Sequence, residues 1–105
     1  MRIAIVGAGG VGGYFGGRLA AAGADVTFLA RGAHLEALRA RGLRITSPKG
    51  DLHLPRVSAE SDPAAVGPVD VAFFAVKLYD TGAALTMLPP LVGPHTIVVG
   101  FQNGV

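Results

Sequence analysis

The sequence predicts an α/β protein built on a doubly wound, mainly parallel β-sheet. An apolar, strand-like run at residues 3–6 leads directly into a glycine-rich turn and then into a helix-forming stretch. Apolar runs recur along the chain with helix-like segments between them, and strands that alternate with helices pair in parallel through right-handed crossovers. The 105 residues, of which 50% are hydrophobic, suit one domain over residues 1–105.

The glycine-rich turn at residues 7–12 has the spacing G-x-G-x-x-G that is typical of dinucleotide-binding sites. In such a turn Gly7 allows the tight exit from the strand, Gly9 lets the backbone approach a pyrophosphate, and Gly12 lets the helix pack closely on the sheet. Amide groups at the helix N-terminus face the phosphates. A structural glycine-rich turn is the alternative, but the strand before and the helix after favour a cofactor site at Gly7, Ala8, Gly9, Gly10, Val11 and Gly12.

The helix that follows is predicted from Val11, Phe15 and Leu19, which recur every four residues, and Gly23 is placed to end it. A glycine inside a helix costs about 1 kcal/mol relative to alanine. This helix contains three more of them, so we expect the adjacent strand or the cofactor to come close to Gly13, Gly16 and Gly17.

A second strand is predicted at residues 25–31, and the residue at its end indicates whether the site prefers NAD or NADP(H). NAD-binding folds carry an acidic residue about 20 residues beyond the glycines, where it accepts hydrogen bonds from the ribose 2′-OH. This strand instead ends in Arg31, whose planar guanidinium suits a 2′-phosphate. The alternative is a solvated surface arginine. The missing acid favours NADP(H) over NAD.

A second helix is predicted at residues 34–41, with Leu35 and Leu38 on one face and Gly42 as its stop. The chain then predicts a β-hairpin, with strands at residues 43–46 and 52–54 around a turn at 48–51.

The remaining segments continue the alternation. Residues 57–68 are polar and contain prolines and glycine, which predicts a loop or a short helix. Residues 69–76 are nearly all apolar, as expected of a central strand buried on both faces. Asp80 is placed to cap a helix at residues 81–88, which two prolines stop, and residues 96–99 predict another buried strand.

Two polar positions lie beyond the ends of predicted strands, and Lys77 follows its strand directly. Lys77 follows the strand at 69–76, and Asn103 follows the strand at 96–99. Ligands of open α/β sheets bind beyond the carboxyl ends of the strands, so we expect both at the edge that holds the glycine turn and Arg31. Gln102 and Asn103 are the only side-chain amides in the chain. The alternatives are an exposed lysine at a strand end and a plain Asn-Gly turn.

Composition excludes several function classes. The net charge of +2 is mild, so no nucleic-acid partner is expected and a solvated face is predicted for Arg39, Arg41 and Arg44. The chain has no cysteine, which removes disulfide and thiol chemistry and fits a reducing cytoplasm. The N-terminal apolar run is too short to cross a membrane, and metal-ligand spacing is missing from His34, His53 and His95.

Four motifs in order resemble the N-terminal half of ketopantoate reductases (2-dehydropantoate 2-reductases). They are the glycine turn at 7–13, the strand end Leu-Ala-Arg at 29–31, Val-Lys-Leu-Tyr-Asp-Thr at 76–81 and Gln-Asn-Gly at 102–104. The resemblance covers the whole chain. It implies a Rossmann-like fold and NADPH-dependent reduction of 2-dehydropantoate to pantoate, a step of pantothenate and coenzyme A biosynthesis.

The family's pattern also implies roles for individual residues. Arg31 would hold the 2′-phosphate, Lys77 would contact the cofactor near the nicotinamide ribose, and Asn103 would orient the substrate beside the nicotinamide. Family members continue into a helical C-terminal domain that supplies the catalytic lysine, and this domain is absent from the present chain. The resemblance therefore implies that residues 1–105 bind NADP(H) but are inactive alone. The sequence leaves open whether the protein forms a homo-oligomer.

Two other functions remain open at the level of sequence. One is an NADP-linked reductase that acts on another small 2-oxo acid. The other is a non-enzymatic, nucleotide-sensing module with the same fold. Arg31, Lys77 and Asn103 favour the reductase, since a sensor would more often carry the acidic ribose ligand.

Overall fold

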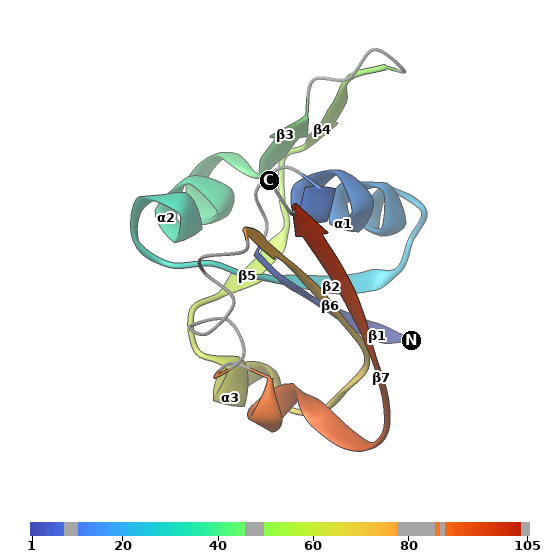
Figure 1. Cartoon of the computed structure of the whole chain (residues 1–105). Helices are drawn as coiled ribbons and strands as arrows, with labels where there is room; N and C mark the ends of the chain where they lie inside the picture. The colour runs from blue at the N-terminus through green and yellow to red at the C-terminus, as the bar shows by residue number, and fades with distance from the viewer. Residues whose placement is uncertain (8–10, 46–49, 78–85, 87, 104–105) are drawn as a thin grey trace.

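The computed structural model describes residues 1–7, 11–45, 50–77, 86 and 88–103. Within them the chain forms a parallel sheet in the order β5-β2-β1-β6-β7 (Figure 1). Every neighbouring pair in this sheet runs parallel. The strands are β1 (Arg2–Val6), β2 (Asp25–Leu29), β5 (Ser58–Glu60), β6 (Val69–Lys77) and β7 (Val92–Asn103).

Helical segments cover both faces of the sheet, which confirms the predicted doubly wound α/β class (Figure 1). One face packs against α1 (Val11–Ala21) and α2 (Gly32–Arg41), and the other against α3 (Pro63–Val66) and the 3₁₀ helix η2 (Pro89–Leu91). Two apolar clusters result. The first contains Ile3 and Ile5 of β1, and the second contains Ala4 and Val6, so β1 is buried on both sides.

Both predicted stop signals and the hairpin are confirmed. α1 ends two residues before Gly23, and α2 ends directly before Gly42, whose N–H donates to the carbonyl of Leu38 at 3.0 Å. The strands β3 (Leu43–Ile45) and β4 (Leu52–Leu54) then pair antiparallel in a separate two-stranded sheet. Of the predicted turn at 48–51, residues 48 and 49 lie outside the described part of the chain.

The prediction for residues 57–68 was only half right, because it missed β5. The expected short helix is present as α3, with Pro63 in its first turn and the Asp62 carboxylate accepting from the N–H of Ala64 at 2.9 Å. β5 has only three residues and one apolar side chain, the buried Ala59, so no apolar run marks it as a strand. Pairing with β2 makes this segment a strand.

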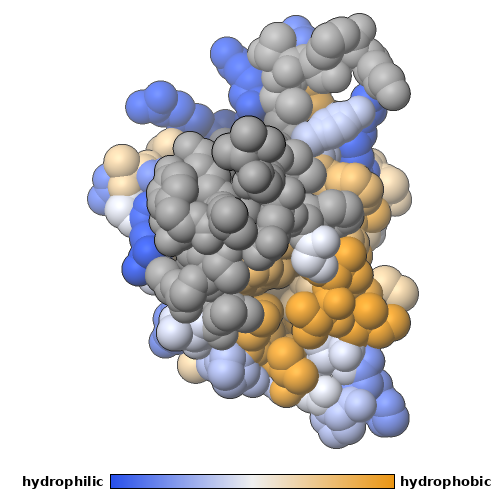
Figure 2. All heavy atoms as spheres, in the orientation of Figure 1, coloured by the Kyte–Doolittle hydropathy of each residue, from blue (hydrophilic) through white to orange (hydrophobic). Residues whose placement is uncertain are grey.

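The expectation of a buried strand at residues 96–99 was wrong. β7 is longer than predicted and has only β6 as a neighbour in the described sheet. Two apolar side chains of the predicted strand are open to solvent, with Ile97 62% and Val98 47% exposed. Figure 2 shows apolar residues gathered on the visible surface of this part of the molecule.

The strand at residues 69–76 is also less enclosed than predicted. In β6 the side chains of Val69, Ala72 and Phe74 are buried, whereas those of Val71 and Phe73 are only half-buried. The central strand buried on both faces is β1, because it has neighbours on both sides and helices above and below. Of the predicted helix at 81–88, residues 81–85 and 87 lie outside the described residues, as does its predicted cap, Asp80.

Arg2 ties the amino end of β1 to the segment that leads into β6. Its backbone N–H donates to the Asp70 carboxylate at 2.6 Å, and its guanidinium donates to the carbonyls of Pro68 at 3.0 Å and Val66 at 2.6 Å. This cluster lies at the amino edge of the sheet, so it steadies the fold at the end opposite the predicted site.

Candidate functional site

The parallel sheet brings the predicted site residues to one edge. Gly7 follows β1, Arg31 lies two residues beyond β2, and Lys77 and Asn103 are the last residues of β6 and β7. Lys77 and Asn103 are register partners on adjacent strands. Because all four strands run in the same direction, these positions share the carboxyl edge, where ligands of such sheets bind.

The glycine turn is described at its two ends. Gly7 leaves β1 with a φ of 87°, a conformation that glycine adopts at no steric cost. α1 begins at Val11 and Gly12, so its N-terminus stands at the carboxyl end of β1. Ala8, Gly9 and Gly10 lie outside the described residues. The first amides of a helix lack partners within it, and no acidic residue occupies the first turn of α1, so this end suits an anion.

Close packing between α1 and the sheet explains a glycine that would otherwise weaken the helix. A Cβ on Gly16 would lie 2.6 Å from Cε1 of Phe28 and 2.8 Å from Cγ1 of Ile5, both fully buried side chains. Gly13 and Gly17 are buried as well, whereas Phe15 is 45% exposed, so the glycine side of α1 is its packed side. At Gly16, therefore, the adjacent strands lie close to the helix. The sequence predicted that either a strand or the cofactor would do so.

Arg31 is the cation at the end of β2. It is exposed and stands at the N-cap of α2 in an extended conformation, with φ −136° and ψ 158°. No side-chain capping bond engages it, and within the described part of the chain its guanidinium has no hydrogen bond or ion pair. The guanidinium is therefore available to an external anion. The acid of this strand, Asp25, lies at the opposite end of β2.

The order of these positions along the edge matches an extended ligand. Arg31 comes first, then the glycine turn after β1, then Lys77 and finally Asn103. Neighbouring strands lie about 4.8 Å apart, so three strand steps separate the first and last positions by about 14 Å. Such an edge can hold a ligand with one anionic group at Arg31, a second at α1 and a polar head at the far end.

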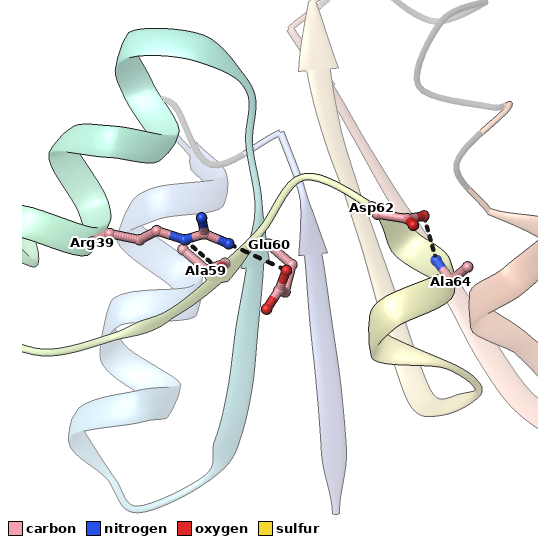
Figure 3. Close-up of polar contacts among 5 residues, drawn as sticks. All are labelled: Arg39, Ala59, Glu60, Asp62 and Ala64. Carbon is pink, nitrogen blue, oxygen red and sulfur yellow. Dashed lines mark hydrogen bonds and ion pairs between the residues drawn. The ribbon is translucent and has the colours of Figure 1, made fainter.

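Sequence reasoning missed one polar contact at this edge. Arg39 of α2 donates from Nε to the carbonyl of Ala59 at 3.2 Å and from Nη2 to Oε2 of Glu60 at 3.2 Å (Figure 3). Arg39 was predicted to belong to a solvated face, and its side chain is indeed 52% exposed, but it is paired. The partner lies 21 residues further along the chain, so no local pattern could reveal the contact.

Within the described residues, neither a metal-binding cluster of side chains nor a membrane-spanning helix is present. No group of three or more histidine, cysteine or acidic side chains among them could hold a metal ion. His34, His53 and His95 are all exposed. None of the described helices is long and apolar enough to cross a membrane.

Comparisons with known proteins point to one family. The model of the family described as ketopantoate reductase PanE/ApbA matches residues 3–105. A 2-dehydropantoate 2-reductase of Mesorhizobium japonicum is 43% identical over 106 residues, covering 100% of this chain and 32% of its own. Among curated relatives of this kind, the chain spans about a third of their length.

Solved structures give the same result. The 2-dehydropantoate 2-reductase of Geobacter metallireducens superimposes with a TM-score of 0.91 at 38% identity, covering 100% of this chain and 35% of its own. The PanE/ApbA family ketopantoate reductase of Ralstonia eutropha superimposes with a TM-score of 0.87 at 43% identity, covering 99% of this chain and 35% of its own.

Proposed function

Because the chain belongs to the ketopantoate reductase family, we propose that it is the NADP(H)-binding part of an oxidoreductase that reduces 2-dehydropantoate to pantoate. The observation that carries the cofactor assignment is the order of groups along the carboxyl edge. An exposed, unpaired arginine stands where NAD-dependent proteins place an acid, next to a glycine turn and a helix N-terminus.

The residues present fit this cofactor. Arg31 would bind the 2′-phosphate, and the backbone from Gly7 to Gly12 with the N-terminus of α1 would bind the pyrophosphate. Lys77 would contact the nicotinamide ribose, and Asn103 would orient the 2-oxo acid beside the nicotinamide ring. The register of Lys77 with Asn103 supports a shared role, because it keeps the two backbones adjacent.

Reduction of a 2-oxo acid requires a hydride at the carbonyl carbon and a proton at the carbonyl oxygen. Bound NADPH supplies the hydride. Asn103 can donate a hydrogen bond to the substrate but has no proton to transfer. We assign the proton and part of the substrate carboxylate binding to residues outside these 105, in the further length that the relatives possess. The absence of cysteine fits the cytoplasm as the place of this reaction.

Titration of the 105-residue chain with NADPH and with NADH tests the proposal. We expect NADPH to bind more tightly, because only NADPH offers Arg31 a charged 2′-phosphate. Equal affinity for the two cofactors, or binding of neither, would overturn the assignment. A nucleotide-sensing module that prefers NAD would show the reverse order.

A further inference from the structure

One ion pair of the described structure lies beside the position assigned to the 2′-phosphate. Arg39 and Glu60 join the last turn of α2 to the carboxyl end of β5 (Figure 3). We propose that Arg39 is a positioning residue for cofactor choice: it holds the Glu60 carboxylate away from Arg31 and from the 2′-phosphate. This inference rests on the proposed NADP(H) site and adds a residue that the family resemblance did not point to.

The backbone places Glu60 next to the proposed phosphate site. Glu60 is the register partner of Leu29, and its carbonyl accepts the N–H of Ala30 at 3.0 Å. Arg31 is the next residue. One strand spacing and two residue steps separate Glu60 from Arg31, which puts their Cα atoms about 8 Å apart.

Strand alternation predicts that the two side chains leave the sheet on the same side. Register partners in a parallel pair point to the same face, so Glu60 shares the face of Leu29. Arg31 lies two residues after Leu29 and keeps an extended backbone, and alternation along a strand returns it to that face. A long acidic and a long basic side chain at this separation can meet.

An unpaired Glu60 would therefore oppose NADPH in two ways. Its carboxylate would repel the 2′-phosphate, and it would compete with that phosphate for the Arg31 guanidinium. It would not oppose NADH, because the ribose 2′-OH is neutral and hydrogen-bonds well to an acid near this strand end. Freed from Arg39, this carboxylate would shift the site toward the unphosphorylated cofactor.

Arg39 prevents this through two contacts from one guanidinium. Its Nε is anchored on the Ala59 carbonyl, which aims Nη2 at the Glu60 carboxylate. The two side chains are 52% and 41% exposed, and pairs at such exposure contribute little to folding stability. Loss of the pair should consequently change cofactor choice far more than it changes the fold.

The test is a set of four variants titrated with NADPH and NADH at low ionic strength. We expect Arg39→Gln to weaken NADPH binding about 3- to 10-fold, from a charge interaction at about 8 Å near the surface, and to change NADH binding less than 2-fold. Arg39→Gln combined with Glu60→Gln should restore the wild-type NADPH affinity. Glu60→Gln alone should tighten NADPH binding slightly. Arg41→Gln removes the same charge from the same helix and should leave both affinities unchanged.

Salt provides a second readout. The electrostatic screening length decreases from about 10 Å at an ionic strength of 0.1 M to about 3 Å at 1 M. The effect of Arg39→Gln on NADPH binding should therefore vanish at high ionic strength. An NADPH-to-NADH ratio unchanged by Arg39→Gln, or a double variant as weak as the single one, would overturn the inference. If Arg39→Gln does not fold, Arg39→Lys replaces it: it keeps the charge but loses the Nε contact with the Ala59 carbonyl, so NADPH binding should weaken in the same direction, and an unchanged NADPH-to-NADH ratio there contradicts the inference. A wild-type chain without NADPH preference would instead overturn the proposed function.

Discussion

The two halves of the carboxyl edge differ in how far the described chain encloses them. Around β2 and β1, which would hold the adenosine end of the cofactor, Phe28 and Ile5 are fully buried between strands and α1. Around β7, which carries Asn103 at the proposed nicotinamide end, Ile97 and Val98 point to opposite faces and both are exposed. An apolar strand is thus part of the core in the first half, whereas a similar apolar strand is an exposed edge strand of the described sheet in the second.

This contrast agrees with the proposed division between cofactor binding in the first half and catalysis in the second. The first half carries the groups proposed to bind the 2′-phosphate and the pyrophosphate, and packed strands and a helix support them. In the second half the chain provides two polar residues whose backbones are register partners, at the end of a strand whose Ile97 and Val98 side chains are exposed. Water weakens each electrostatic contact there, so we expect the first half to bind the cofactor and the second to fall short of turnover.

The largest expected effect is the absence of turnover. The 105-residue chain should bind NADPH yet show no oxidation of NADPH that depends on 2-dehydropantoate, because a positioned proton donor contributes about 10²- to 10⁴-fold. Absorbance at saturating NADPH measures this. Steady, substrate-dependent oxidation that Lys77→Ala abolishes would make Lys77 the acid and would remove the contrast between the two halves.

The next largest effect is expected on stability, when a larger side chain replaces Gly16 at the close contact between α1 and the sheet. Gly16→Val should lower the free energy of unfolding by about 3 kcal/mol, because the new side chain would overlap Phe28 and Ile5, which have no room to move. Denaturant titration followed by circular dichroism measures it.

Gly100→Val in β7 is the matched control, because a Cβ there meets no described atom within 4 Å. Its free energy of unfolding should change by about 0.5 kcal/mol or less. If both variants were equally destabilised, the two halves would not differ in packing as the structure indicates.

A smaller effect is expected from Arg31 itself. A hydrogen bond to a charged group contributes about 1.5–3 kcal/mol, so Arg31→Ala should weaken NADPH binding roughly 10- to 100-fold and leave NADH binding almost unchanged. Calorimetric titration with both cofactors measures the difference. Equal losses for the two would show that Arg31 supports the fold of the site rather than the 2′-phosphate.

Local sequence signals were enough to predict the helices and strands in the first half of the chain. The apolar run before Gly7, the helix after it and the stops at Gly23 and Gly42 all follow from residues close in sequence, and the structure confirms them. The hairpin of β3 and β4 was predicted for the same reason. The position of Arg31 at the end of β2 also came from the sequence, while its role in binding the cofactor is still a prediction.

The sequence by itself determined the parallel α/β class, the shared edge of Gly7, Arg31, Lys77 and Asn103, and the resemblance to the family, because these depend on order and local pattern. Only the tertiary structure decided that Ser58–Glu60 forms a strand, that Ile97 and Val98 are exposed, and that Arg39 pairs with Glu60. Burial and ion pairing depend on which neighbours a segment meets in space. An apolar run on β1 lies between two strands and two helical layers, while one on β7 has a single neighbouring strand in the described sheet, and no local pattern distinguishes the two.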